Sequence, residues 1–145
     1  MKFPLVLLAG LALAGGAVAQ RAKKMVVHVD GNDVSGALGS VYEFPNAYMA
    51  PASKLVSAVS NGGLDFRVAA DGSGLIERNG KVVVKIGSGK AEVHTGQEVR
   101  NLEIPSSIEK LEDGTVVMDP ALLGWLLGIS IDYTQSGFDL YTPCF

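Results

Sequence analysis

Hydrophobic and polar residues follow two different periods along this chain, and together they predict short strands interrupted by two helices. Alternation with a period of two recurs between turn signals spaced about 8–12 residues apart, which is typical of antiparallel hairpins. Two segments depart from this alternation. Leu55, Val56 and Val59 lie at helical spacing after Pro51, and residues 121–127 are apolar almost throughout. The pattern predicts an α+β fold of mainly antiparallel short strands with two helices.

Turn chemistry divides the alternating segments into strands. Asn79-Gly80 is a strong two-residue hairpin signal and joins expected strands at 75–78 and 81–86. The glycine-rich segment 34–40 is expected to be a loop. The basic segment 21–24 is expected to be a solvated leader, and the alternative is contact with anionic lipid or a wall polymer. Further strands are expected at 25–30, 41–44, 48–50, 64–68, 91–95, 99–104, 115–118, 129–133 and 138–141.

Two stretches of the chain resemble copies of one unit. Met49 and Met118 share the offset of Pro51 and Pro120 (118 − 49 = 69). Each copy reads as a short strand, a proline-started helix, a glycine stop and a second strand. A duplication of this kind predicts one core shared by two related halves. The residues expected to be equivalent are Leu64, Phe66 and Val68 in the first half and Ile129, Ile131 and Tyr133 in the second.

The second of the two helices is predicted to be the more deeply buried. Its segment, 121–127, is apolar on every side, which is typical of a helix enclosed by a core. We therefore expect the only tryptophan, Trp125, to lie in that core. Its expected neighbours are Leu122, Leu126, Leu127, Met118 and Ile131.

The N-terminus has the features of an export signal. Lys2 precedes an uncharged apolar segment at 3–19, and Ala17-Val18-Ala19 is a small-x-small cleavage site before Gln20. We predict a signal peptide at 1–19 and a single domain at 20–145. The alternative is a retained anchor, because this apolar segment reaches the lower limit for spanning a membrane. In either case the expected location is the periplasm or the cell exterior.

Composition limits the partners further. The 145 residues have a formal net charge of −3 at pH 7 and no long basic run, which argues against nucleic acid. Cys144 is the only cysteine, so no internal disulfide can form. Cys144 either forms a disulfide with another molecule or is an incidental thiol near the chain end.

Few residues suggest chemistry. His28 and Asp30 alternate on one expected strand, and Glu92 and His94 alternate on another. If these strands were neighbours, the four side chains could form a copper or zinc site, and otherwise they are solvated polar residues. We predict no catalytic residue and no cofactor. The serines that adjoin glycines and the acidic pairs fall in expected turns: Ser88, Ser136 and Glu112-Asp113.

Three aromatic residues precede the first helix and form the candidate interaction surface. Tyr42, Phe44 and Tyr48 occupy alternating positions, so they could form a stacking platform for a glycan or peptide. The alternative is a half-buried strand surface without a ligand.

The order of several short motifs resembles the copper amine oxidase N-terminal-like domain, also called the stalk domain family. The matching segments are Val29-Asp30-Gly31, then 86–93 (IGSGKAEV), 114–120 (GTVVMDP) and 127–133 (LGISIDY). The resemblance extends from about Val27 to Thr142. The chain departs from the family pattern at Ser53 and Leu122, where arginine is usual, and at Val68-Ala69 and Tyr133-Thr134, where Trp-Asp is usual.

The resemblance implies a noncatalytic module of the cell envelope or the extracellular space. The family takes its name from an appended domain, not from a copper site. With the export signal, it predicts an exported interaction or structural module whose partner is another envelope protein or a cell-wall polymer. The alternative is a periplasmic ligand- or metal-binding carrier.

Overall fold

A computed structural model describes residues 21–44, 47–105 and 108–143. Within these residues, no helix is long and apolar enough to cross a membrane. The predicted signal peptide at 1–19 and the lone Cys144 lie outside the described residues.

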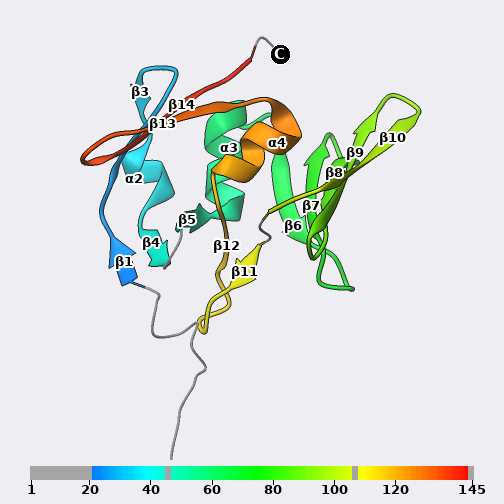
Figure 1. The fold of residues 1–145 in the computed structure, drawn as a ribbon, viewed down its shortest axis with the longest axis horizontal. Helices are drawn as coiled ribbons and strands as arrows, with labels where there is room; N and C mark the ends of the chain where they lie inside the picture. Colours follow the sequence, from blue (N-terminus) through cyan, green and yellow to red (C-terminus); the bar gives the residue numbers. More distant parts are fainter. Residues whose placement is uncertain (1–20, 45–46, 106–107, 144–145) are drawn as a thin grey trace, which may run out of the picture.

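Three β-sheets surround two helices in the described part of the chain (Figure 1). The helices are α3 (Ala52–Ser60) and α4 (Ala121–Leu127), and a third short helix is α2 (Ser35–Leu38). The sheets are almost entirely antiparallel, which confirms the predicted α+β class. The third helix was not expected from the sequence.

The first sheet brings the strands before α3 and α4 together. It consists of β1 (Arg21–Lys23), β4 (Val41–Phe44), β5 (Ala47–Pro51), β12 (Val116–Met118) and β11 (Glu109–Lys110), in that order. β5 pairs with β12 in antiparallel orientation, with Ala50 opposite Met118. Residues 21–23, expected to be part of a solvated leader, form β1, which adds to the edge of β4 through backbone pairing that no side-chain pattern reveals.

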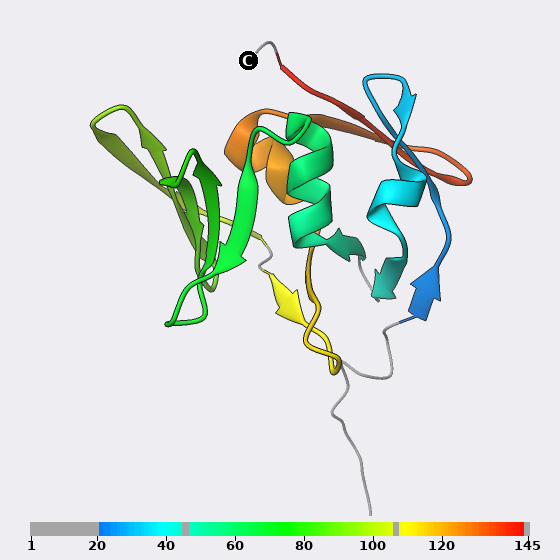
Figure 2. The ribbon, with the colours of Figure 1, turned by 180° about the vertical axis from the view of Figure 1, so that it is seen from behind.

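The second sheet is a meander joined by tight turns. Its strands are β6 (Asp65–Val68), β7 (Gly74–Arg78), β8 (Lys81–Ile86), β9 (Lys90–Thr95) and β10 (Glu98–Glu103). Asn79 and Gly80 have φ values of 52° and 79°, which confirms the predicted hairpin turn. The hairpin of β9 and β10 projects from the rest of the molecule (Figure 2).

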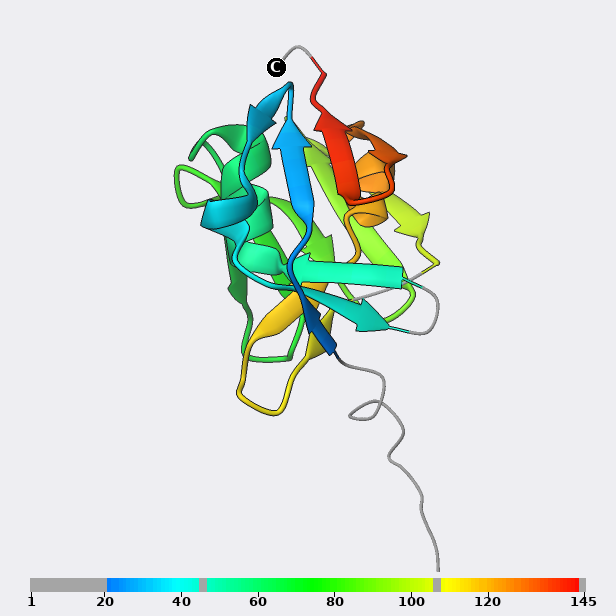
Figure 3. The same ribbon diagram turned by 90° about the vertical axis from the view of Figure 1, so that its left-hand side faces the viewer.

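The third sheet joins the two ends of the described chain. It consists of β13 (Ser130–Tyr133), β14 (Gly137–Tyr141), β2 (Val26–Val29) and β3 (Asn32–Asp33). β14 and β2 lie side by side and are parallel (Figure 3). Just beyond them, the Asp30 carboxylate accepts hydrogen bonds from the backbone N–H and the hydroxyl of Thr142.

The segment 34–40 contains α2 instead of the expected loop. The Asp33 carboxylate accepts a hydrogen bond from the Ser35 N–H at 2.8 Å, and the Ser35 hydroxyl oxygen accepts one from the Val27 N–H at 2.9 Å. Leu38 is fully buried, and Gly39 follows it with a φ of 74°. Tertiary contacts of one leucine and one serine thus stabilise a turn of helix whose own sequence does not favour it.

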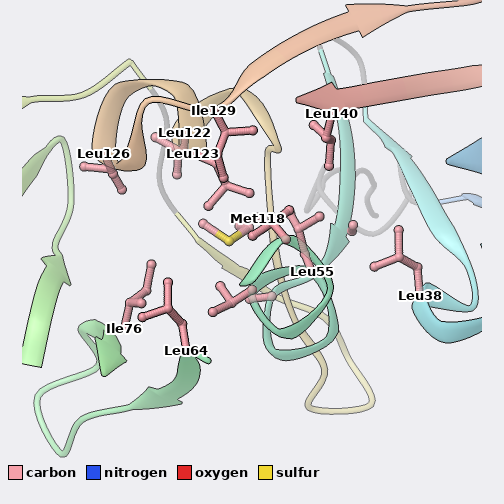
Figure 4. Close-up of a cluster of buried hydrophobic side chains, with 14 of the residues drawn as sticks. Leu38, Leu55, Leu64, Ile76, Met118, Leu122, Leu123, Leu126, Ile129 and Leu140 are labelled. Carbon is pink, nitrogen blue, oxygen red and sulfur yellow. The ribbon is translucent and has the colours of Figure 1, made fainter. Parts of the chain in front are cut away.

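Buried side chains from all three sheets meet around α3 and α4 (Figure 4). Leu55, Val56 and Val59 form the buried face of α3, as their spacing predicts. Leu122, Leu123 and Leu126 form the corresponding face of α4. One continuous core therefore supports both helices.

Trp125 does not belong to this core, and the prediction that it does was wrong. Its side chain is 58% exposed, because the three buried leucines of α4 define the face toward the core and Trp125 lies outside that face. Leu127 is only half-buried. Apolar residues on every side of a seven-residue helix do not require burial on every side.

Alternation of Leu64, Phe66 and Val68 with Asp65 and Arg67 predicts one buried face for β6, and this prediction was partly wrong. Leu64 just before the strand is buried, but Phe66 is half-buried and Val68 is 44% exposed. β6 is the edge strand of its sheet, so its far end extends beyond the core.

Candidate functional site

The predicted aromatic surface divides between two faces of the first sheet. Tyr42 and Phe44 pair with Met49 and Ala47, whereas Tyr48 pairs with Glu43 and therefore points to the opposite face. Tyr48 packs against the main core. The structure thus brings together only Tyr42 and Phe44. Tyr48 belongs to the next strand, β5, and the alternation along β4 does not continue into it.

Tyr42 and Phe44 border a second, smaller apolar cluster on the outer face of this sheet. Met49, Leu111 and Val117 are its buried members, and both rings pack against them while remaining half-exposed. Leu111 was not expected here from the sequence, because its position depends on β11 and β12 pairing. We call this group the outer aromatic face.

The outer aromatic face is suited to apolar and stacking contacts. Two half-exposed rings on a rigid sheet present a large apolar area at a small cost in conformational entropy. The cross-strand partners Ala22 and Ala47 are small, so they leave the rings accessible from the side. This arrangement can hold a sugar ring or an apolar side chain.

Tyr48 has a different role on the inner face. The Lys23 ammonium nitrogen lies 5.7 Å from the centroid of the Tyr48 ring, which is within the range of a cation–π contact. This contact ties β1 to β5 across β4, so Tyr48 contributes to the sheet and not to an exposed platform.

The four candidate metal ligands divide between the third sheet, with His28 and the adjoining Asp30, and the second sheet, with Glu92 and His94. His28 Nδ1 lies 3.0 Å from Asp139 Oδ1 in the third sheet, and His94 Nε2 lies 3.3 Å from Glu92 Oε1 in the second. Their strands are not neighbours, so the condition for a joint site is not met. Among residues 21–44, 47–105 and 108–143, no group of three or more His, Cys, Asp or Glu side chains is arranged to hold a metal ion.

Asp30 is engaged elsewhere. The two hydrogen bonds from Thr142 favour its ionised form, and they lower the pKa of the Asp30 carboxyl. This carboxylate acts as a clamp between the end of β2 and the end of β14.

His28 instead stands in a row of acidic residues that the sequence did not reveal. Strand register places Asp132, Asp139, His28 and Asp33 opposite one another across β13, β14, β2 and β3. Finding this row requires the strand order of the sheet, which brings together residues 111 positions apart. Hydrogen bonds from Ser35 lower the pKa of Asp33. The Asp33 carboxylate at this end of the row therefore already has a neighbouring partner.

The other acidic and serine candidates lie in turns. Asp71 and Asp113 accept backbone N–H bonds from Ser73 and Thr115, and these bonds lower the pKa of both carboxyls. Ser88 and Ser136 lie in the turns before β9 and β14. These residues organise the turns of the sheets, as the sequence predicted.

Asp119 differs from these carboxyls, because its pKa is raised and theirs are lowered. Burial beside the start of α4 raises the pKa of Asp119, although its Oδ1 accepts a hydrogen bond from the Ala121 N–H at 2.9 Å. Burial and the nearby Asp119 also raise the pKa of Tyr133. The hydrogen bond from the Ala121 N–H satisfies a free backbone donor at the start of α4. Asp119 therefore has a structural role at the start of this helix.

Comparison with known proteins gives no relative: no family model, no curated protein and no solved structure matches the chain.

Proposed function

We propose that this chain is an exported, noncatalytic interaction or structural module of the cell envelope, built on a stalk-type fold. The observation that carries the proposal is the outer aromatic face, where Tyr42 and Phe44 remain half-exposed over Met49 and Val117. Half-exposed apolar rings held on a sheet are suited to binding a partner.

The compartment follows from the N-terminal sequence. Lys2, the apolar segment 3–19 and Ala17-Val18-Ala19 support cleavage before Gln20 and release into the periplasm or the medium. The partner is then another envelope protein or a cell-wall polymer. A retained leader would be the only membrane contact.

We further propose that the domain consists of two related halves. Each contains a strand, a helix and a hairpin: β5, α3, β6 and β7 in the first half, and β12, α4, β13 and β14 in the second. Their hairpins support this relation, because Leu64 and Ile129 are both buried while Val68 and Tyr133 are both exposed. The antiparallel pairing of β5 with β12 is compatible with a two-fold axis between the halves.

Binding to isolated envelope fractions tests the interaction proposal. The processed protein is mixed with purified cell-wall sacculi or with envelope extract, and the retained fraction is measured at increasing protein concentration. We expect the double variant Tyr42→Ser/Phe44→Ser to weaken retention by about tenfold or more, as for central aromatic contacts. Tyr141→Ser is the matched control, because Tyr141 is an exposed aromatic of the third sheet.

Two outcomes would contradict the proposal. The first is a protein that stays free in both fractions at all concentrations. The second is retention that the Tyr42→Ser/Phe44→Ser variant leaves unchanged. Intact mass separately tests export, because secreted protein that begins at Met1 would exclude cleavage before Gln20.

A further inference from the structure

We propose that the free edge of β10 pairs with β10 of a second copy of this chain, so that the second sheets of two molecules become one continuous sheet. The two strands are antiparallel, and the register is centred on Val99. This inference concerns self-association and does not depend on the proposed envelope function.

The first observation is that β10 is an available edge. It is the outermost strand of the second sheet, and five of its six residues are exposed. In an antiparallel sheet every second residue of such a strand directs its N–H and C=O away from its neighbour. These groups form a template for another strand. The hairpin that carries them projects from the rest of the molecule (Figure 2).

The second observation is that the residues around Val99 complement themselves. In the proposed register Val99 lies opposite Val99 of the second copy, and Glu98 lies opposite its Arg100. By symmetry the Arg100–Glu98 pair occurs twice. Gln97 precedes β10 and lies in the turn, so the strand-to-strand contact is confined to Glu98, Val99 and Arg100.

The charges at this edge have no alternative partner. Among the described residues, no ion pair joins Glu98 or Arg100 to another side chain. Val99 is 50% exposed, although it is a β-branched residue suited to a covered strand. Pairing around Val99 would satisfy both charges and cover this apolar side chain.

Other symmetric registers are less favourable. A two-fold axis normal to the sheet keeps each face on its own side, so the register must be centred on a residue. Centring on Arg100 places two guanidinium groups opposite each other, which is unfavourable. Centring on Asn101 places Arg100 opposite Leu102 and Val99 opposite Glu103, so neither charge finds a partner.

The same charges explain why the edge does not pair indiscriminately. Charged side chains on an edge strand oppose pairing with an arbitrary apolar strand. This opposition is absent when the second strand places an opposite charge beside each charge of β10. A second copy of β10 does so, because Glu98 and Arg100 flank Val99. Because the contact covers only a few residues on each side, we expect a weak, reversible dimer and not an obligate one.

Charge reversal provides a test of both the surface and the register. The processed protein is studied by sedimentation velocity from about 10 µM to about 1 mM, a range that covers weak association. Glu98→Arg and Arg100→Glu each place like charges opposite each other, and each should weaken dimerisation by about tenfold or more. Glu112→Arg, in an exposed turn outside the three sheets, is the control and should leave dimerisation unchanged.

Restoring the charge order should restore the dimer in two ways. The double variant Glu98→Arg/Arg100→Glu again pairs opposite charges and should dimerise like the unmodified chain. An equimolar mixture of the two single variants should form a heterodimer, because every pair across it is then Arg opposite Glu. Recovery in the mixture also shows that neither variant had lost its fold.

Three results would overturn the proposal. One is a monomer at every concentration of the unmodified chain. Another is a dimer that both single variants leave intact, which would place the contact elsewhere. The last is a failure of both the double variant and the mixture to recover, which would exclude the register centred on Val99.

Discussion

The two strand–helix–hairpin units have similar interiors and different exteriors. In α3 the large buried residues are Leu55, Val56 and Val59, and in α4 they are Leu122, Leu123 and Leu126. Both sets follow the same spacing. The outward positions differ, because α3 exposes Ser53, Lys54 and Ser57, whereas α4 exposes Gly124 and Trp125.

This difference shows which sequence offset aligns the buried positions of the two helices. The prolines are 69 residues apart, and that offset would place Trp125 at the buried position of Val56 (125 − 56 = 69). The buried residues themselves are 67 apart (122 − 55 = 67), which places Trp125 at the position of half-buried Ala58. The core therefore determines the phase of each helix, and the proline that starts it does not.

The surroundings of the two hairpins differ as well. The hairpin of β6 and β7 continues into β8, β9 and β10, while the hairpin of β13 and β14 takes up β2 from the other end of the chain. The second unit thus depends on residues before the first unit. We therefore expect that neither unit is stable without the other.

The largest expected effect comes from separating the halves. A fragment of residues 20–90 lacks β12 from the first sheet and β14 from the third, so β5 and β2 each lose a neighbour. A segment of this size has only a small margin of stability from its own core, so it does not tolerate the loss of these neighbours. We expect no cooperative thermal transition by circular dichroism, and a cooperative one would contradict a shared core.

The next effect compares the two helices directly. Leu55→Ala and Leu122→Ala should each lower the free energy of unfolding by about 2–5 kcal/mol, since both side chains are fully buried. Trp125→Ala should cost less than about 1 kcal/mol, because this side chain is mostly exposed. Urea titration measures all three variants.

Tryptophan fluorescence provides an independent measurement for the same comparison. Native emission should be red-shifted and easily quenched, since Trp125 is the only tryptophan and is exposed. Blue-shifted, protected emission, or a cost for Trp125→Ala equal to that of Leu122→Ala, would mean that α4 has the opposite orientation.

A third prediction compares the glycines that begin the second strand of each hairpin. A Cβ at Gly137 would overlap the carbonyl oxygen of Val26, where the backbones of β14 and β2 approach closely. At Gly74 the nearest atom is on the Phe66 ring, 2.9 Å away, and this side chain can move. We expect Gly137→Ala to cost about 3 kcal/mol and Gly74→Ala about 1 kcal/mol.

Chemical denaturation of both glycine variants checks this difference. Equal costs would show that β14 does not approach β2 more closely than Phe66 approaches Gly74. A loss of the whole transition only in Gly137→Ala would instead strengthen the inference that the second unit depends on β2.

Local signals made much of the fold predictable. The Asn79-Gly80 turn, the alternation of 81–86 and the spacing of Leu55, Val56 and Val59 depend on neighbouring residues, so the sequence alone was sufficient. The parallel pairing of β2 with β14 could not be predicted, because it joins residues 111 positions apart and leaves no local pattern.

The candidate site shows the same division. The half-exposure of Tyr42 and Phe44 follows from strand alternation, whereas the position of Tyr48 depends on which strand pairs with which. Leu111 and the row containing His28 and Asp139 also arise only after the sheets assemble. The prediction that Trp125 is buried was wrong for a related reason. Composition does not reveal which side of a helix faces the core.

The smallest expected effect concerns the pH dependence of stability, to which two carboxyls contribute with opposite signs. Asp30 has a lowered pKa through its bonds to Thr142, whereas burial raises the pKa of Asp119. The Asp30 contribution is present above its unfolded pKa of 3.8 and is lost as pH falls through the lower folded value. The Asp119 contribution is present at pH values below 3.8 and is lost as pH rises through the higher folded value.

Conservative amides should therefore shift the pH profile in opposite directions. Asp30→Asn should reduce stability at neutral pH and make it less sensitive to acid, because the clamp on Thr142 loses its charge. Asp119→Asn can keep the bond to the Ala121 N–H without burying a charge, so neutral stability should be equal or slightly higher. Thermal melts from pH 3 to pH 7 compare the variants, with Glu112→Gln in an exposed turn as the control. Parallel profiles for Asp30→Asn and Asp119→Asn would contradict the assignment, because two carboxyls with opposite pKa shifts must change the slope of stability against pH with opposite signs.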